Sequence, residues 1–298
     1  DDAFRKTVAL KLVRGGRHSD LFERRFRQER QILARLHHPN IATVLDGGTT
    51  EDGQPYLVME YVEGQPITHF CAARGLGTRE RLVLFRTVCG AVQYAHQSLV
   101  VHRDIKPGNV LVDGQGVVKL LDFGIAKLLA SGVEAELAPT APVLPMLTPE
   151  YASPEQVKGQ PVTTASDVYS LGVLLYELLA GRRPYEVQGE SLEAIVQAVC
   201  QTQPKAPSEA ATERPGTTRP AGTVPAASEL RGDLDTIVLK ALRKEPERRY
   251  RTPHELSEDL RRHLEGLPVT ARADTIGYRA GKFVLRHRTA VVAAVPVA

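Results

Sequence analysis

Four polar residues that lie close together in the sequence could carry out phosphate chemistry. Asp104, Lys106, Asn109 and Asp122 all fall in the stretch HRDIKPGNVLVDGQGVVKLLDFG, residues 102–124. Carboxylate and amide oxygens bind a divalent cation such as Mg²⁺, and an ammonium group offsets phosphate charge. These residue types therefore suit a site that holds a metal-bound polyphosphate beside an attacking hydroxyl.

The sequence between these residues predicts a β-hairpin that brings two of them together. Val110–Val112 and Val117–Leu121 are rich in strand-forming residues, and the Asp-Gly-Gln-Gly segment between them, 113–116, is a strong turn signal. A hairpin of this size returns Asn109 and Asp122 to the same edge. Their oxygens could then share one cation.

A lysine and a glutamate near the start of the chain could join this site. Lys11 lies in a predicted strand, 7–13, and a helix is predicted over 20–36. Phe22, Phe26, Leu33 and Leu36 form the apolar stripe of that helix, and Glu29 completes their spacing. A carboxylate on an apolar face needs a cationic partner or contact with water. The residues alone leave two alternatives, a Glu29 to Lys11 ion pair or a Glu29 that reaches solvent.

The predicted elements divide the chain into two lobes, an α+β architecture. Residues 1–62 are rich in strands, with further strands at 41–45 and 56–62 and a single helix, whereas residues 63–267 are mainly helical. The predicted helices of the larger lobe are 78–97, 167–179, 233–242 and 253–264. A proline-rich stretch, 201–228, contains few apolar residues and predicts a disordered insert.

Composition limits the classes of function. The chain has 298 residues, of which 42% are hydrophobic and 24% charged, which is typical of a soluble globular protein. A net charge of +3 is too small to favour nucleic acid as the main partner. The three cysteines, Cys71, Cys89 and Cys200, are widely spaced and indicate a reducing compartment, with buried apolar thiols as the simplest interpretation.

The polar residues occur in an order that resembles one enzyme family. His102-Arg103-Asp104 with Asn109, followed by Asp122-Phe123-Gly124, resembles the catalytic loop and metal-binding motif of protein kinases. The run Val8-Ala9-Leu10-Lys11 looks like the kinase strand whose lysine holds phosphates, and Lys106-Pro107 is similar to the serine/threonine branch. The resemblance covers about residues 7–267 and implies a two-lobed kinase fold that transfers the γ-phosphoryl group of ATP.

The resemblance also implies a role for individual residues. The catalytic residues would be Asp104, Lys106 and Asn109, and the ligands of Mg²⁺, or of Mn²⁺ in its place, would be Asn109 and Asp122. The residues that bind ATP would be Ala9, Lys11, Glu29, Met59, Glu60, Val62, Leu111 and Asp122. Main-chain groups of Glu60 and Val62 would contact adenine, and Lys11 would pair with Glu29.

By the same resemblance, residues 124–155 form an activation segment for a protein substrate. Thr148 would contact the catalytic loop near Lys106 and shape the slot for a serine or threonine hydroxyl. Ser131, Thr140 and Thr148 are the hydroxyl residues of this segment, and Arg103 is the expected partner of a phosphate placed there. A homodimer would allow autophosphorylation. Two structural supports are implied as well, namely Asp167 beneath the catalytic loop and a buried Glu155 to Arg249 ion pair.

The last part of the chain predicts membrane attachment. Residues 268–288 carry five basic residues against one acid, and an apolar run, 290–295, follows them. This pattern is typical of the cytoplasmic flank of a membrane helix and resembles the juxtamembrane segment of bacterial serine/threonine kinases, which implies a cytoplasmic domain of a single-pass inner-membrane protein. A small docking helix is the alternative.

One family feature is missing, and two other functions compete with kinase activity. No glycine occurs among the ten residues before Lys11, so we expect weak nucleotide binding without a glycine-rich loop.

A pseudokinase scaffold would keep the fold without turnover, although such proteins often lose one of the charged residues present here. A small-molecule phosphotransferase would keep the catalytic loop, although segment 148–155 favours a polypeptide substrate.

Overall fold

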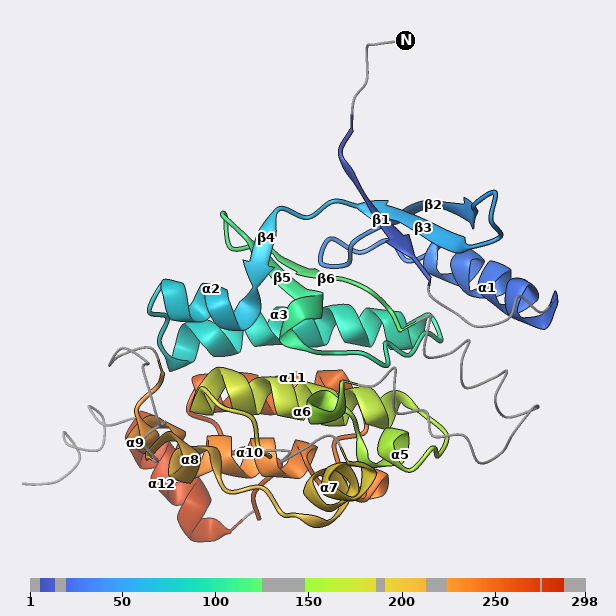
Figure 1. Ribbon diagram of the computed structural model, residues 1–298. Helices are drawn as coiled ribbons and strands as arrows, with labels where there is room; N and C mark the ends of the chain where they lie inside the picture. Colours follow the sequence, from blue (N-terminus) through green and yellow to red (C-terminus); the bar gives the residue numbers. More distant parts are fainter. Residues whose placement is uncertain are drawn as a thin grey trace, which may run out of the picture.

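A small antiparallel sheet with one helix forms the first lobe (Figure 1). This fold comes from a computed structural model that describes residues 6–13, 20–124, 148–185, 191–212, 224–273 and 275–286. The strand order is β1 (Val8–Leu12), β3 (Pro55–Glu60), β2 (Val44–Thr49), with α1 (Asp20–Leu33) beside the sheet. On α1 and the turn that follows it, Phe26, Leu33 and Leu36 are buried, which confirms these three positions of the predicted stripe, while the Phe22 side chain lies outside the described part of the structure.

A second three-stranded sheet connects the first lobe to the helical one. It consists of β4 (Gly64–Pro66), which the sequence did not predict, β5 (Val110–Asp113) and β6 (Val118–Leu120). The β5–β6 pair is the predicted hairpin, closed by the Asp113 carboxylate, which accepts hydrogen bonds from the backbone N–H groups of Gln115 and Val117. A Cβ at Gly64 would lie 2.8 Å from the carbonyl oxygen of Val112, so glycine permits β4 to approach β5.

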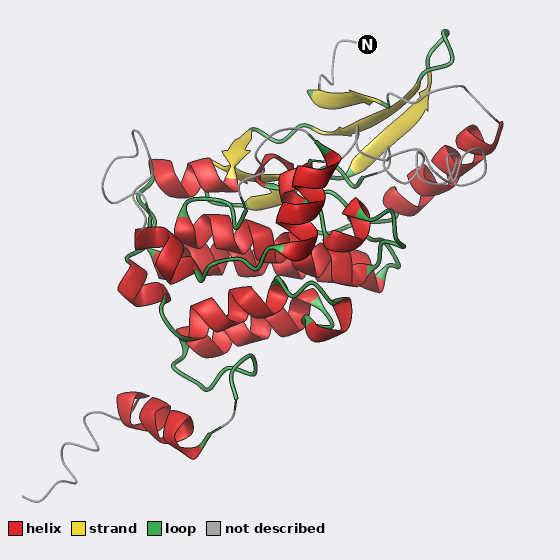
Figure 2. Ribbon diagram, turned by 60° about the horizontal axis from the view of Figure 1, so that its bottom comes forward, coloured by secondary structure: helices red, strands yellow, loops and turns green. Residues whose placement is uncertain are grey.

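The larger lobe is built from helices (Figure 2), and one of them, α6 (Thr164–Ala180), is buried along almost its whole length. Because most of its residues are apolar, α6 is stable only inside the lobe. The helices of this lobe are α2 (Ile67–Ala73), α3 (Thr78–Gln97), α5 (Pro154–Val157), α6, α7 (Leu192–Val196), α8 (Pro207–Thr212), α9 (Ala227–Leu230), α10 (Asp233–Ala241), α11 (Pro253–Leu264) and α12 (Ile276–Arg286). A Cβ on Gly172 of α6 would lie 2.9 Å from the Ala241 Cβ, which shows how closely α10 packs on α6.

The prediction of a disordered insert over 201–228 is wrong wherever that stretch is described. Pro207, Ser208 and Ala210 are buried in α8, which contacts α6. The Asp235 carboxylate accepts hydrogen bonds from the backbone N–H and the hydroxyl of Ser208, at 2.9 and 2.7 Å. Because its side chains are small, this short helix can pack closely against its neighbours. The low hydrophobicity of the stretch was therefore not a sign of disorder. Residues 213–223 lie outside the described part of the chain.

The segment after residue 267 docks on the larger lobe through two carboxylates, Asp259 and Asp233. Asp233, at the start of α10, accepts a hydrogen bond from the Tyr278 hydroxyl at 3.0 Å and lies 2.5 Å from the Lys282 ammonium of α12. Burial raises the pKa of Asp233, but its close contacts with His263 and Lys282 outweigh the effect of burial and hold the pKa below its usual value. Within the described ranges, no helix is both long and apolar enough to cross a membrane. The apolar run 290–295 lies outside those ranges.

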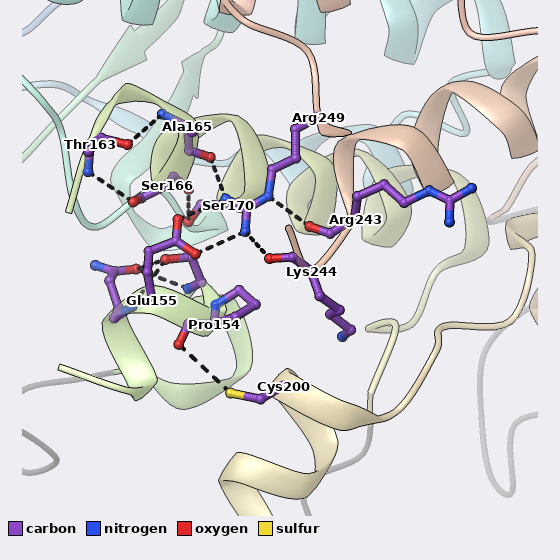
Figure 3. A network of polar contacts seen from close by, with 12 residues as sticks. Pro154, Glu155, Thr163, Ala165, Ser166, Ser170, Cys200, Arg243, Lys244 and Arg249 are labelled. Atoms are coloured by element: carbon purple, nitrogen blue, oxygen red, sulfur yellow. Dashed lines mark hydrogen bonds and ion pairs between the residues drawn. The ribbon is translucent and has the colours of Figure 1, made fainter. Parts of the chain in front are cut away.

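A buried ion pair joins the end of the activation segment to the helical lobe, as expected (Figure 3). The Arg249 guanidinium donates two hydrogen bonds to Glu155, at 2.7 and 2.9 Å, and its other N–H groups donate to the carbonyls of Ala165, Arg243 and Lys244. All five guanidinium N–H groups therefore have an acceptor. Burial alone would raise the pKa of Glu155, but the bonds from Arg249 lower it.

Replacement of Arg249 by Met should destabilise the protein by about 3–5 kcal/mol, because it leaves the Glu155 carboxylate buried without its cation. Urea denaturation near neutral pH measures the free energy of unfolding and tests the expected destabilisation. The difference in the free energy of unfolding between the variant and wild type should become smaller as the pH falls through the lowered pKa of Glu155. The reason is that the ion pair stabilises the fold only while the carboxylate is ionised.

Arg248→Met is the matched control. Its side chain is 62% exposed and lies 3.9 Å from Glu245, so the free energy of unfolding should change by less than about 0.5 kcal/mol. An Arg249→Met variant that is as stable as this control would contradict the assigned role of the buried pair.

Candidate active site

The hairpin and a 3-10 turn place the predicted catalytic residues together. The turn, Pro107–Asn109, leads into β5, and the backbone N–H of Leu121 donates to the Asn109 carbonyl at 2.8 Å. The Asn109 side-chain amide donates to the Asp104 backbone carbonyl at 2.7 Å and to the Asp104 carboxylate at 2.9 Å. The predicted closeness of the two hairpin ends, Asn109 and Asp122, is thus reproduced in the backbone.

Lys106 connects the catalytic loop to the end of the activation segment. Its ammonium nitrogen lies 2.8 Å from Asp104 Oδ2 and donates to the Thr148 hydroxyl at 3.0 Å. The Thr148 contact was expected from the resemblance. Further along the segment, the Gln156 side chain donates to the Arg103 carbonyl at 2.9 Å, which adds a second link to the loop.

Asp167 holds the loop from below, as the resemblance implied. Its Oδ2 accepts from the His102 backbone N–H at 2.7 Å, and its Oδ1 accepts from the Arg103 N–H at 2.8 Å. His96 of α3, which the sequence did not point to, lies with Nε2 2.7 Å from Asp167 Oδ2. Arg103 has φ +69°, a left-handed backbone that costs energy in a residue with a side chain. The two N–H bonds to Asp167 stabilise this conformation.

The His102 ring ties the catalytic loop to the metal-binding motif. It is fully buried, and burial lowers its pKa, so the ring is neutral. Its Nδ1 accepts from the Asp104 N–H at 3.3 Å, which leaves the proton on Nε2 to donate to the Leu121 carbonyl at 2.8 Å. The ring also contacts Phe123, with centroids 4.7 Å apart, and Gly124 N–H donates to the His102 carbonyl.

The structure pairs Lys11 with Asp122, so the predicted Lys11 to Glu29 ion pair is wrong for this conformation. The Lys11 ammonium lies 3.1 Å from Asp122 Oδ1. Glu29 lies instead in the field of Arg103, and both line a small cavity of about 70 Å³ with Phe123. Burial raises the pKa of Glu29 and the Arg103 charge partly offsets this.

Most of the predicted nucleotide-binding residues lie on the two sheets or in the connection between them, whereas Glu29 lies on α1. Ala9 of β1 is opposite Met59 of β3, and Leu111 is in β5 opposite Pro66. Val62 lies in that connection, between β3 and β4. The Glu60 side chain has a role that the sequence did not suggest, because it pairs with Lys119 of β6 at 2.8 Å and accepts from the Thr43 N–H. This pair links the two sheets at the hinge.

Asn109 and Asp122 have the chemistry of a divalent cation site. The Asn109 amide nitrogen is turned toward Asp104, so its oxygen is the atom left for a metal. Asp122 Oδ1 is shielded from solvent and accepts no hydrogen bond among the described groups, and its contact is the Lys11 ammonium. A carboxylate and an amide oxygen at one sheet edge fit Mg²⁺, which prefers hard oxygen ligands.

Comparison with known proteins agrees with this geometry. The model of the protein kinase domain family matches residues 1–260. The chain belongs to the protein kinase domain family. It is 38% identical over 271 residues to serine/threonine-protein kinase PknB of Mycobacterium tuberculosis and 37% identical over 273 residues to serine/threonine-protein kinase PrkC of Bacillus subtilis. The resemblance inferred from the sequence is confirmed.

These matches cover most of this chain but less than half of each relative. The share of this chain is 89% for PknB and 91% for PrkC, and the shares of the relatives are 40% and 38%. A crystal structure of Rad53 1-466 in complex with AMP-PNP matches with a TM-score of 0.59 and 22% identity, over 85% of this chain and 57% of that one. This likeness supports the fold alone, and it confirms the two-lobed kinase architecture.

Replacement of Asp167 by Asn should lower the free energy of unfolding by about 1–3 kcal/mol. Both carboxylate oxygens accept backbone N–H bonds, so an amide NH₂ must face one of the donors and leave a buried group without its partner. Denaturation with urea measures this change.

Asp113→Asn applies the same substitution to a turn in which Oδ1 accepts both backbone bonds. An asparagine oxygen can replace that atom, so this control should change stability by less than about 0.5 kcal/mol. Equal stability of the two variants would argue against Asp167 as the support of the loop.

Proposed function

We propose that this domain transfers the γ-phosphoryl group of ATP to serine or threonine hydroxyls of protein substrates, with Mg²⁺ as cofactor. The observation that carries the proposal is the pair of contacts made by the Lys106 ammonium, which joins Asp104 to Thr148. This arrangement puts a proton acceptor, a cation and the end of the substrate-binding segment at one point.

Each residue of the loop has a distinct task in this mechanism. Asp104 accepts the proton of the substrate hydroxyl or orients it for attack, and the hydrogen bond from Asn109 fixes the position of its carboxylate. Lys106 offsets negative charge on the group in transfer. Asn109 and Asp122 would hold Mg²⁺, which neutralises phosphate charge when bound. Mn²⁺ has similar ligand preferences and could replace it.

Lys11 would change partners during the reaction cycle. In the present conformation it neutralises Asp122. Binding of the α- and β-phosphates would draw the ammonium to them and allow Glu29 to replace Asp122 as its carboxylate partner, which leaves Asp122 for the cation. Ala9, Met59, Val62 and Leu111 would line the adenine site, and the Glu60 to Lys119 pair would hold the hinge.

A polypeptide substrate is favoured over a small molecule by the segment 148–156. Thr148 and Gln156 tie it to the catalytic loop at two points, and Glu155 anchors its end in the helical lobe. Such a fixed platform suits an extended chain. Regulation through Ser131 or Thr140 remains part of the proposal, and both residues lie outside the described ranges.

We further propose that the domain works on the cytoplasmic side of an inner membrane, attached through the segment after Arg288, and that two copies meet for autophosphorylation. The support is the basic stretch before the apolar run in the sequence. A scaffold without turnover is the second candidate, and the Lys11 to Asp122 pair favours it only if the pair persists when ATP is present.

Asp122→Ala should abolish Mg²⁺-dependent phosphate transfer, and Asp104→Asn should slow it by about 100- to 10,000-fold. Radiolabelled ATP and a generic basic protein provide the assay, in a version of the chain lengthened at its N-terminus to include a glycine-rich loop. The labelled product should be phosphoserine or phosphothreonine.

Asp113→Asn, on the same hairpin, is the control and should keep wild-type activity, because its turn bonds survive. Transfer that persists in Asp122→Ala would refute the metal assignment. Nucleotide binding without transfer in wild type would support the scaffold instead.

Lys11→Met should slow phosphate transfer by about 100-fold, since it removes a cation from the phosphates while it keeps an unbranched side chain at this half-buried position. Turnover and ATP affinity should both be measured, the latter by calorimetry. Lys158→Met, at an exposed position, serves as the control for loss of one positive charge. Equal activity of these two variants would show that Lys11 does not act on the nucleotide.

A further inference from the structure

A cavity of about 550 Å³ lies at the base of the larger lobe, far along the chain from the catalytic loop. It is bordered by the end of α11, the connecting segment 267–272 and α12, which lies beneath α10 (Figure 1). Four of its lining residues are arginines, Arg261, Arg262, Arg272 and Arg279, and none of the described lining residues is acidic. We call it the arginine cavity. Its volume falls within the usual range of ligand sites.

The connecting wall of the arginine cavity is held by a buried carboxylate. Asp259 of α11 is fully buried and accepts hydrogen bonds from the Thr270 N–H and hydroxyl, at 2.7 and 2.8 Å, and from the Ala271 N–H at 2.8 Å. The Tyr250 hydroxyl also donates to it, at 2.9 Å. The backbone of this wall is therefore fixed before any ligand arrives.

The α12 side of the cavity is fixed by Tyr278 and Asp233. The Tyr278 hydroxyl accepts from the Val269 N–H and donates to Asp233, both at 3.0 Å. The Arg272 guanidinium lies over the Tyr278 ring, 4.7 Å from its centre, and 3.6 Å from the Asp233 carboxylate. Tyr278 thus sets the positions of both the wall and one of the arginines.

The lining of the cavity is positively charged, because its four arginines are accompanied by no acidic residue among the described lining residues. The carboxylates that pair with these arginines lie outside the lining: Glu258 pairs with Arg261 and Arg262, Glu265 pairs with Arg261, and Asp233 pairs with Arg272. The side chains of Arg261, Arg262 and Arg272 are 35%, 38% and 49% exposed, so an incoming anion can reach them.

The lining combines charge with an apolar surface. Leu267, Pro268 and Val269 are its apolar lining residues. Guanidinium groups bind phosphate through paired hydrogen bonds, and an apolar wall suits a group with a hydrocarbon portion. A free phosphate ion would contact the guanidinium groups but would make no use of the apolar wall. The apolar run 290–295 follows α12 in the sequence, which would bring the cavity to a membrane surface if that run inserts.

We propose that the arginine cavity binds the phosphodiester headgroup of an anionic phospholipid. This site would fix the orientation of the larger lobe on an anionic membrane, and it is independent of phosphate transfer at Asp104.

The test compares two double variants of the full 298-residue chain. Arg262→Gln with Arg279→Gln removes two charges from the cavity, whereas Arg248→Gln with Arg251→Gln removes two exposed charges near the opposite end of α11, about 15 Å away along the helix. This separation exceeds the Debye length of about 8 Å at physiological salt. Co-sedimentation is measured with vesicles of pure phosphatidylcholine and with vesicles that also contain phosphatidylglycerol.

Wild type should bind the phosphatidylglycerol vesicles more strongly than the neutral ones. The cavity variant should lose roughly 25-fold in affinity for the anionic vesicles, about fivefold per charge, while the control stays within about twofold of wild type. Equal losses in both variants would mean that net charge alone drives binding and would overturn the proposal. Equal binding of wild type to both vesicle types would overturn it as well.

A soluble arm distinguishes the headgroup from free phosphate. Short-chain phosphatidylglycerol below its micelle concentration should bind wild type in calorimetry and should not bind the cavity variant, whereas inorganic phosphate at the same concentration should bind neither. Phosphate binding that matches the lipid would overturn the assignment to a lipid. Urea denaturation of each variant checks that the fold is intact, and a cavity variant that binds short-chain lipid normally would also refute the proposal.

Discussion

The buried Asp167 carboxylate is the interaction on which the catalytic geometry depends. It lies near the start of the most apolar helix of the protein, where an unpaired charge would be costly. Two backbone N–H groups and the His96 ring satisfy it, and in return it holds Arg103 in a left-handed conformation. The positions of Asp104 and Lys106 follow from that backbone.

A carboxylate that accepts hydrogen bonds also holds other segments to the helical lobe. Glu155 anchors the end of the activation segment, Asp259 anchors the segment after α11, and Asp233 anchors α12. In each case a buried or half-buried carboxylate accepts hydrogen bonds from a segment that has little apolar surface of its own. Because each carboxylate is fully hydrogen bonded or paired with a cation, its burial costs less than its desolvation alone would suggest.

The Lys11 to Asp122 ion pair and the electrostatic interaction between Glu29 and Arg103 show how charge selects a conformation. Lys11 with Asp122, and Glu29 in the field of Arg103, neutralise the same four charges that the resemblance arranges differently. The proposed exchange of Lys11 from Asp122 to Glu29 would leave the net charge of the site unchanged, so bound phosphate and metal would decide which pairing prevails.

The sequence by itself determined the local elements and the chemistry of the loop. The hairpin, the helices α3, α6 and α11, and the grouping of Asp104, Lys106 and Asn109 followed from turn residues, periodicity and short spacing, which depend on neighbours along the chain. Only the tertiary structure decided the partner of Lys11, the bridge from Glu60 to Lys119, the packing of α8 and the arginine cavity. Each of these joins residues that are distant in the sequence, and such contacts depend on which groups folding brings within a few ångströms and on how little water remains between them.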